Sequence, residues 1–180
     1  MSFEPLKLLA DLFLRHAVIR VAPPTILPRC RYTLLLMSDK VIFSQPYGSV
    51  LVDASVPCII TQWHTFANAT DFIGMMEAAT QYYERHSTPA RPWGWVGDVR
   101  QMGAIPAKVQ AWLIAEFNHR AAQAGLREMS IVVAETVFGQ LSAQRYAQET
   151  AQAVDNYVLP TDFYPSLDAA KAGAGAALRR

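Results

Sequence analysis

Charged residues are scarce in this chain of 180 residues, and neither sign of charge dominates. Lysine and arginine together number 16, aspartate and glutamate number 15, and all four make up 17% of the sequence. Because no dense cluster of lysine and arginine occurs, binding to nucleic-acid phosphates is not expected. Apolar residues make up 52%, which is typical of a globular chain. The length suits one domain with an appendage.

Cysteine and long apolar runs are also nearly absent. The two cysteines, Cys30 and Cys58, have no metal-binding spacing and are too few for a disulfide framework. No apolar stretch of about 20 residues and no secretory signal is visible. We therefore expect a cytoplasmic protein with reduced thiols and no integral membrane segment.

The common signatures of catalysis are missing as well. The chain has no Gly-x-Ser-x-Gly motif and no glycine-rich phosphate-binding loop, and its four histidines share no metal-binding spacing. Only His64 is expected near the end of a strand, where exposure to solvent explains it. We expect no cofactor and no metal, and a binding role is favoured over an enzymatic one.

The N-terminal segment, residues 1–31, has an amphipathic pattern followed by several prolines. This predicts a helix and then a proline-rich linker. The polar positions recur every four residues opposite an apolar stripe. They are Lys7, Asp11 and Arg15, facing Leu6, Leu9, Phe13 and Ala17. Such a helix can dock on the domain, on a partner subunit or on a membrane surface. We expect it to mediate self-association, giving a homodimer.

Residues 32–172 are expected to form an α/β domain, and the glycine- and alanine-rich tail 173–180 is expected to be flexible. Short apolar runs bounded by turn residues indicate strands, and apolar residues at helical spacing indicate helices. The predicted strands are 32–37, 41–43, 50–52, 58–63, 93–99, 129–134 and 157–159. The predicted helices run from Asn68 or Thr70 to His86, from Pro106 to Gly125, from Ser142 to Val154 and from Ser166 to Ala172. This alternation predicts a mixed, mainly parallel sheet with flanking helices, to which the first hairpin strands add antiparallel edges.

Three segments of this domain resemble the SpoIIAA-like, STAS/SEC14-like family of small bacterial proteins. They are Ile-Ile-Thr-Gln-Trp at 59–63, Trp-Val-Gly-Asp-Val-Arg-Gln-Met at 95–102, and the apolar strand with its following loop at 131–142. The resemblance covers residues 48–172 and ends in a strand followed by a helix. It implies a mixed sheet flanked by helices and a regulatory, ligand-binding or interaction role.

The chain departs from this family at one informative place. Sporulation-type members carry a phosphorylatable serine after the strand that corresponds to residues 93–99. Here the loop from Arg100 to Pro106 contains neither serine nor threonine. A phosphorylation switch at that position is therefore chemically impossible.

The candidate site residues are Asp98, Arg100, Glu135 and Trp95. Asp98 and Arg100 lie at the carboxyl end of a strand, where α/β proteins usually bind ligands, and a helix is expected to begin near Pro106. Arg100 and the helix start could hold an anion, or Asp98 and Arg100 could simply order the loop. Glu135 follows the next strand and either approaches this pair or flanks a turn. Trp95 could form an apolar wall.

These observations predict a non-catalytic binding or regulatory module without the serine switch. One alternative is a carrier of a small anionic or lipid-like ligand that uses the same site. A weaker alternative is a small hydrolase-like enzyme in which Asp98 and Glu135 perform acid–base work.

Overall fold

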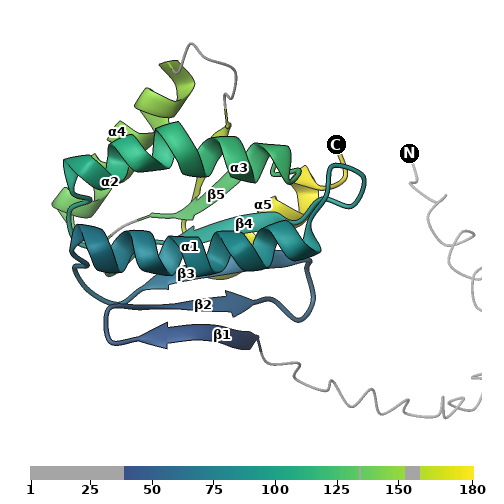
Figure 1. The fold of residues 1–180 in the computed structure, drawn as a ribbon, viewed down its shortest axis with the longest axis horizontal. Coiled ribbons are helices and arrows are strands. Elements are labelled where there is room, and N and C mark those ends of the chain that lie inside the picture. Colours follow the sequence, from purple (N-terminus) through teal and green to yellow (C-terminus); the bar gives the residue numbers. More distant parts are fainter. Residues whose placement is uncertain (1–38, 134, 153–158) are drawn as a thin grey trace, which may run out of the picture. The chain divides into compact units, whose positions relative to one another are not determined.

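The computed structural model describes residues 39–133, 135–152 and 159–180, which form an α/β fold around one six-stranded sheet (Figure 1). The strands are β1 (Lys40–Gln45), β2 (Gly48–Val52), β3 (Cys58–Trp63), β4 (Gly94–Asp98), β5 (Met129–Val132) and β6 (Thr161–Tyr164). They lie side by side in sequence order. The predicted helix in residues 1–31 and the predicted strand 32–37 fall outside the described residues.

The sheet is mixed, as predicted. β1, β2 and β3 pair in antiparallel fashion, whereas β3, β4, β5 and β6 are parallel neighbours. β3 and β4 are buried on both faces, which explains their nearly continuous apolar sequences. The prediction of a mainly parallel α/β sheet with hairpin strands at one edge is therefore confirmed.

The helices follow the parallel strands along the chain. They are α1 (Ala69–His86), α2 (Ala107–Trp112), the π-helical segment η1 (Leu113–Phe117), α3 (Asn118–Gln123), α4 (Val137–Gln152) and α5 (Leu167–Ala177). Asn68 caps α1 by accepting a hydrogen bond from the Asp71 N–H, as expected from the sequence. Gly125, with φ of 101°, ends the second helical stretch, because a left-handed conformation there favours glycine.

The main hydrophobic core lies between one face of the sheet and α1, α2, η1 and α3. Phe72 and Tyr83 of α1 and Phe117 of η1 pack there around Trp95 of β4. Trp95 is fully buried, and its ring packs edge-on against the ring of Phe117, with the two ring centroids 4.9 Å apart. Because the parallel strands follow one another without reversal, crossovers of one hand place these helices on the same face of the sheet.

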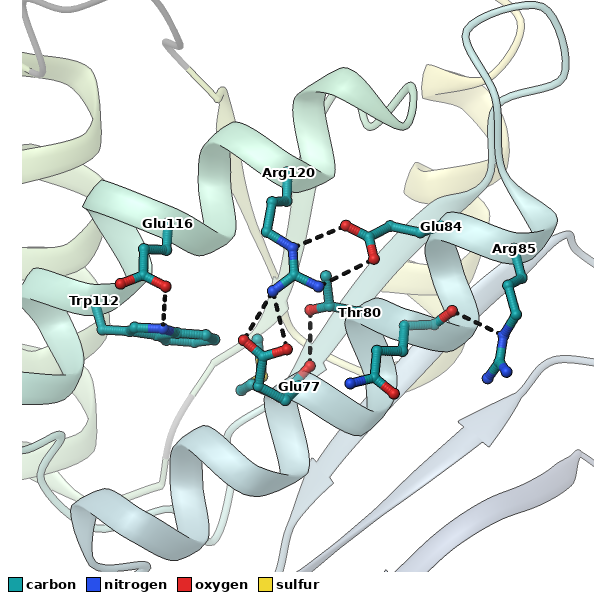
Figure 2. A network of polar contacts seen from close by, with 9 residues as sticks. Glu77, Thr80, Glu84, Arg85, Trp112, Glu116 and Arg120 are labelled. Atoms are coloured by element: carbon teal, nitrogen blue, oxygen red, sulfur yellow. Dashed lines mark hydrogen bonds and ion pairs between the residues drawn. The ribbon is translucent and has the colours of Figure 1, made fainter.

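An arginine joins the two long helical stretches at the surface of this layer. Arg120 of α3 binds Glu77 and Glu84 of α1, with nitrogen–oxygen distances of 2.8 Å to each (Figure 2). Its planar guanidinium reaches both carboxylates at once, which a lysine ammonium cannot do in the same bidentate manner.

The opposite face of the sheet is covered by α5. Ala170 and Ala174 pack against Cys58, Ile60 and other buried residues of β3, β4 and β5. The Cys58 thiol is fully buried, and burial raises its pKa to about 12. This cysteine is a core residue, as predicted.

The prediction that the last helix ends at Ala172 and leaves a flexible tail is wrong. The helix runs to Ala177, because its small residues allow close contact with the sheet. A Cβ added to Gly94 would lie 2.8 Å from the Cβ of Ala174, so neither position tolerates a larger side chain. The Tyr164 ring occupies the space beside Gly173.

Other predicted boundaries also need correction. α4 begins at Val137 rather than Ser142. The apolar pattern of the sequence does not indicate this first turn of the helix, because its apolar side chains do not face the core. The last strand is 161–164 rather than 157–159, and the prolines on either side hid it in the sequence. Residues 157 and 158, and the predicted end of α4 at 154, lie outside the described residues. Pro106 precedes α2 as its N-cap rather than occupying its first position.

Candidate functional site

The carboxyl ends of β3, β4 and β5 form the edge of the sheet at which the candidate site lies. In the parallel register Gln62 of β3 stands opposite Asp98 of β4, and Asp98 stands opposite Val132 of β5. The loops that follow these strands therefore meet at one edge. They enclose a polar pocket of about 190 Å³, lined by Gln62, Trp63, His64, Asp98, Arg100, Gln101 and Glu135.

An ion pair forms the inner part of this pocket. Arg100 donates two hydrogen bonds to Asp98, from Nε at 2.9 Å and from Nη2 at 2.7 Å. The Gln62 amide donates a third hydrogen bond to the same carboxylate at 3.1 Å. The Asp98 side chain is only 3% exposed, whereas that of Arg100 is 38% exposed. The guanidinium thus covers a buried carboxylate and keeps one side toward the solvent.

The surroundings of Asp98 keep it ionised. Burial by itself would raise the pKa of Asp98, but the hydrogen bonds from Arg100 and Gln62 and the charge of Arg100 outweigh burial and lower it. The pKa of Arg100 is raised, first by its hydrogen bonds to Asp98 and also by the nearby charge of Glu135. Asp98 and Arg100 therefore form a pair of opposite charges joined by two side-chain hydrogen bonds.

Glu135 reaches the pocket through the loop after β5. Its backbone N–H donates to the Arg100 carbonyl oxygen at 3.0 Å, which joins the two loops. The neighbouring Thr136 accepts a hydrogen bond from the Gly139 N–H at 3.0 Å and donates one to the Met102 carbonyl oxygen at 3.4 Å. Thr136 therefore orders the start of α4, while Glu135 remains exposed beside Arg100.

The predicted wall residue Trp95 does not belong to this pocket, and that expectation is wrong. Side chains alternate along a strand, so residues three positions apart point to opposite faces. Trp95 points into the core beneath α1 and η1, and its indole N–H faces the Thr61 hydroxyl at 3.3 Å. The structure thus brings together Asp98, Arg100 and Glu135 and separates Trp95 from them.

Four residues of the pocket are not among the candidates from the sequence, namely Gln62, Trp63, His64 and Gln101. The sequence indicates Gln62 only as part of a strand, and it explains His64 by exposure to solvent. His64 lies in the pocket wall, where its Nε2 is 3.1 Å from the Ser49 hydroxyl. The positions of Gln62 and His64 follow from the pairing of β3 with β4, so a prediction of strand order would have placed them beside Asp98.

Among the described side chains, no three histidines, cysteines, aspartates or glutamates are grouped so that they could hold a metal ion. Within the same part of the chain, no helix is long and apolar enough to cross a membrane.

No model of a known protein family matches the chain, and no curated protein matches it. The resemblance to SpoIIAA-like proteins stays a prediction from the sequence.

Proposed function

We propose that this protein is a non-catalytic binding module that holds a small polar ligand at the carboxyl ends of β3, β4 and β5. The observation that carries the proposal is the pocket in which an exposed guanidinium is held in place by a buried carboxylate. A side chain fixed in this way loses little further freedom when a ligand binds, so the cost of binding is reduced.

A binding role is favoured over acid–base catalysis by the state of Asp98. A general acid or base works best when its pKa lies near the operating pH. The pKa of Asp98 is shifted downward, away from neutrality, and its oxygens already accept hydrogen bonds from Arg100 and Gln62. The hydrolase-like alternative therefore has little support from this carboxylate.

The charges of the pocket indicate which ligands fit. One arginine faces two carboxylates, Asp98 and Glu135, so the pocket has no surplus of positive charge. A simple anion would be attracted to Arg100 but repelled by Glu135. A small zwitterion would satisfy both, with its carboxylate on Arg100 and its ammonium group near Glu135. This chemistry is favoured over the purely anionic or lipid-like ligand expected from the sequence.

A regulatory role is the form of this proposal that the predicted family implies. The link between the Glu135 N–H and the Arg100 carbonyl oxygen couples the pocket to the first turn of α4. A ligand that draws Arg100 and Glu135 together would act on that turn, and no phosphorylated serine is needed.

The test is a titration of the full chain followed by two-dimensional amide NMR, with glycine, acetate and phosphate as separate probes. We expect glycine to shift the amide signals of Gln62, His64, Arg100 and Glu135 more strongly than either anion does. Glu135→Gln should weaken binding of glycine at least tenfold while leaving the fold intact, because the Glu135 side chain is exposed. Arg145→Ala, which removes an arginine outside the pocket, is the matched control.

Two results would contradict the proposal. One is the absence of shifts at the pocket with all three probes at millimolar concentration. The other is binding that Arg100→Ala and Glu135→Gln both leave unchanged. Stronger shifts with phosphate than with glycine would instead favour the anionic ligand predicted from the sequence.

A further inference from the structure

An apolar surface lies on α4 and the adjoining strand ends, and it shares no residue with the polar pocket proposed to bind a ligand. We call it the α4 surface, and it consists of Val133, Val137, Phe138, Leu141 and Phe163. Phe138 is 73% exposed and Val137 is 68% exposed. Single exposed apolar residues are common, but three on one side of α4, next to a groove that two more line with α4, mark a surface that binds something.

The α4 surface has a ridge and a groove next to each other. Val137, Phe138 and Leu141 form the ridge, because Leu141 follows Val137 by four positions and Phe138 by three, which places it beside both on the helix surface. The groove has a volume of about 360 Å³ and is lined by Val133, Gln140, Ala143, Gln144 and Phe163. No charged side chain of the described residues lines it.

We infer that the α4 surface binds a second copy of this chain and forms a two-fold symmetric dimer. In such a dimer the same patch serves both partners, so it must be complementary to itself. A two-fold axis beside α4 would place the ridge of each copy in the groove of the other. The uncharged groove opposes no like charges, and the nearby Arg145 is already paired with Glu149 of its own helix at 2.6 Å.

The apolar area of the α4 surface is large enough to form the centre of a dimer interface. Its five side chains present on the order of 400 Å² of apolar area, judged from their exposed fractions. A stable dimer typically buries about 800 Å² on each partner, of which roughly two thirds is apolar. The patch thus supplies most of the apolar centre of one such interface, with the polar rim left to neighbouring glutamines.

The two copies should meet through α4 rather than by joining their sheets. β6 is the edge strand of the described sheet, and an exposed edge can pair with another chain. However, β6 has only four residues, contains Asp162, and lies between Pro160 and Pro165. Proline and charge on a short edge strand oppose edge-to-edge pairing. We therefore expect the two copies to associate by packing the side chains of α4 against the α4 of the second copy.

The test measures the mass of the full chain in solution by light scattering and sedimentation from low micromolar to submillimolar concentration. We expect a mass near twice the 20.0 kDa of one chain at the upper end. Phe138→Asp should raise the dissociation constant at least tenfold. Val41→Asp is the matched control, since Val41 is an exposed apolar residue on β1, at the other edge of the sheet. Circular dichroism verifies that both variants are folded.

A cross-linking experiment identifies the surface directly. A photoreactive phenylalanine analogue at position 138 of the full chain should join α4 of one copy to α4 of the other, and the same analogue at position 41 should not. A single-chain mass at every concentration would overturn the inference. So would a dimer that Phe138→Asp leaves intact but Phe13→Asp abolishes, since residues 1–31 would then mediate association, as the sequence pattern predicts.

Discussion

Arg100 is the residue on which the candidate site depends, because its guanidinium is the main partner of a buried carboxylate. Removing it leaves Asp98 with the Gln62 amide as its remaining side-chain donor. A buried charge without its partner is costly, although the partial exposure of Arg100 moderates the loss. The pair therefore serves both the stability of the strand ends and the chemistry of the pocket.

We predict that Arg100→Ala lowers the free energy of unfolding by about 2 kcal/mol near neutral pH. In the natural chain the lowered pKa of Asp98 adds stability that is present above the unfolded pKa and lost as pH falls through the folded one. In the variant, burial raises that pKa, so the cost should shrink as Asp98 becomes protonated in acid. Urea unfolding at several pH values measures both effects, and a cost independent of pH would contradict the assignment.

Gly97 allows a second test at the residue scale. It lines an apolar cavity of about 50 Å³ in the main core, and a Cβ added there would have its nearest neighbours at 3.9 Å, an ordinary contact distance. Gly97→Ala should raise the free energy of unfolding by about 0.5–1 kcal/mol, since alanine loses less chain entropy and fills empty space.

The matched control for Gly97 is Gly94 on the same strand. Gly94→Ala should destabilise the protein by about 1–3 kcal/mol, because the new methyl group would overlap Ala174 of α5. If both substitutions change stability in the same direction, the contrast between the cavity and the close contact with α5 is wrong.

At the scale of elements, α5 is held by charge as well as by packing. Lys171 pairs with Asp53 at 2.6 Å and with Asp39 at 2.8 Å, which fixes α5 to the turn after β2 and to the residue before β1. The Asp53 carboxylate also accepts hydrogen bonds from the N–H groups of Ser55 and Val56. This buried cluster explains how a helix rich in alanine and glycine keeps one position on the sheet.

We predict that Asp53→Asn removes about 2 kcal/mol of stability near neutral pH. Burial opposes ionisation of Asp53, but Lys171 and the turn N–H groups lower its pKa to about 2. The contribution is therefore complete above the unfolded pKa of about 3.8 and is lost as pH falls toward 2. Acid unfolding of the variant should lack this dependence, whereas Asp162→Asn on the exposed side of β6 should keep it.

At the scale of the whole molecule, the order of the strands decides which face of the sheet the crossover helices cover and which face needs another helix. Consecutive parallel strands with crossovers of one hand place their helices on one face and leave the other face bare. The chain resolves this with α5, which returns across the opposite face and buries the second hydrophobic cluster. The resulting molecule has its polar pocket and its α4 surface near the same carboxyl edge.

The proposed dimer has a consequence at this scale. If two copies bind through the α4 surface, the melting temperature should rise with protein concentration, because association stabilises the folded state by mass action. Phe138→Asp should remove this dependence, and Val41→Asp should preserve it. A melting temperature that does not change with concentration would contradict the dimer, independently of the ligand proposal.

Much of the fold could be predicted, whereas the site could be predicted only in part. β3 matches its predicted limits, and α1 follows its predicted cap and ends at His86, because local signals act there. The start of α4 was missed, since Val137 and Phe138 break the amphipathic pattern by facing outward. That break was itself the available signal for the α4 surface.

The sequence by itself determined the alternation of strands and helices, the burial of the central strands on both faces, and the position of Asp98 and Arg100 at a strand end. These features depend on residues close together along the chain. Only the tertiary structure decided that Gln62, His64 and Glu135 join that pair, that Trp95 faces the core, and that the five apolar side chains of the α4 surface remain exposed. Those outcomes depend on strand order and on contacts between distant segments, which local periodicity does not encode.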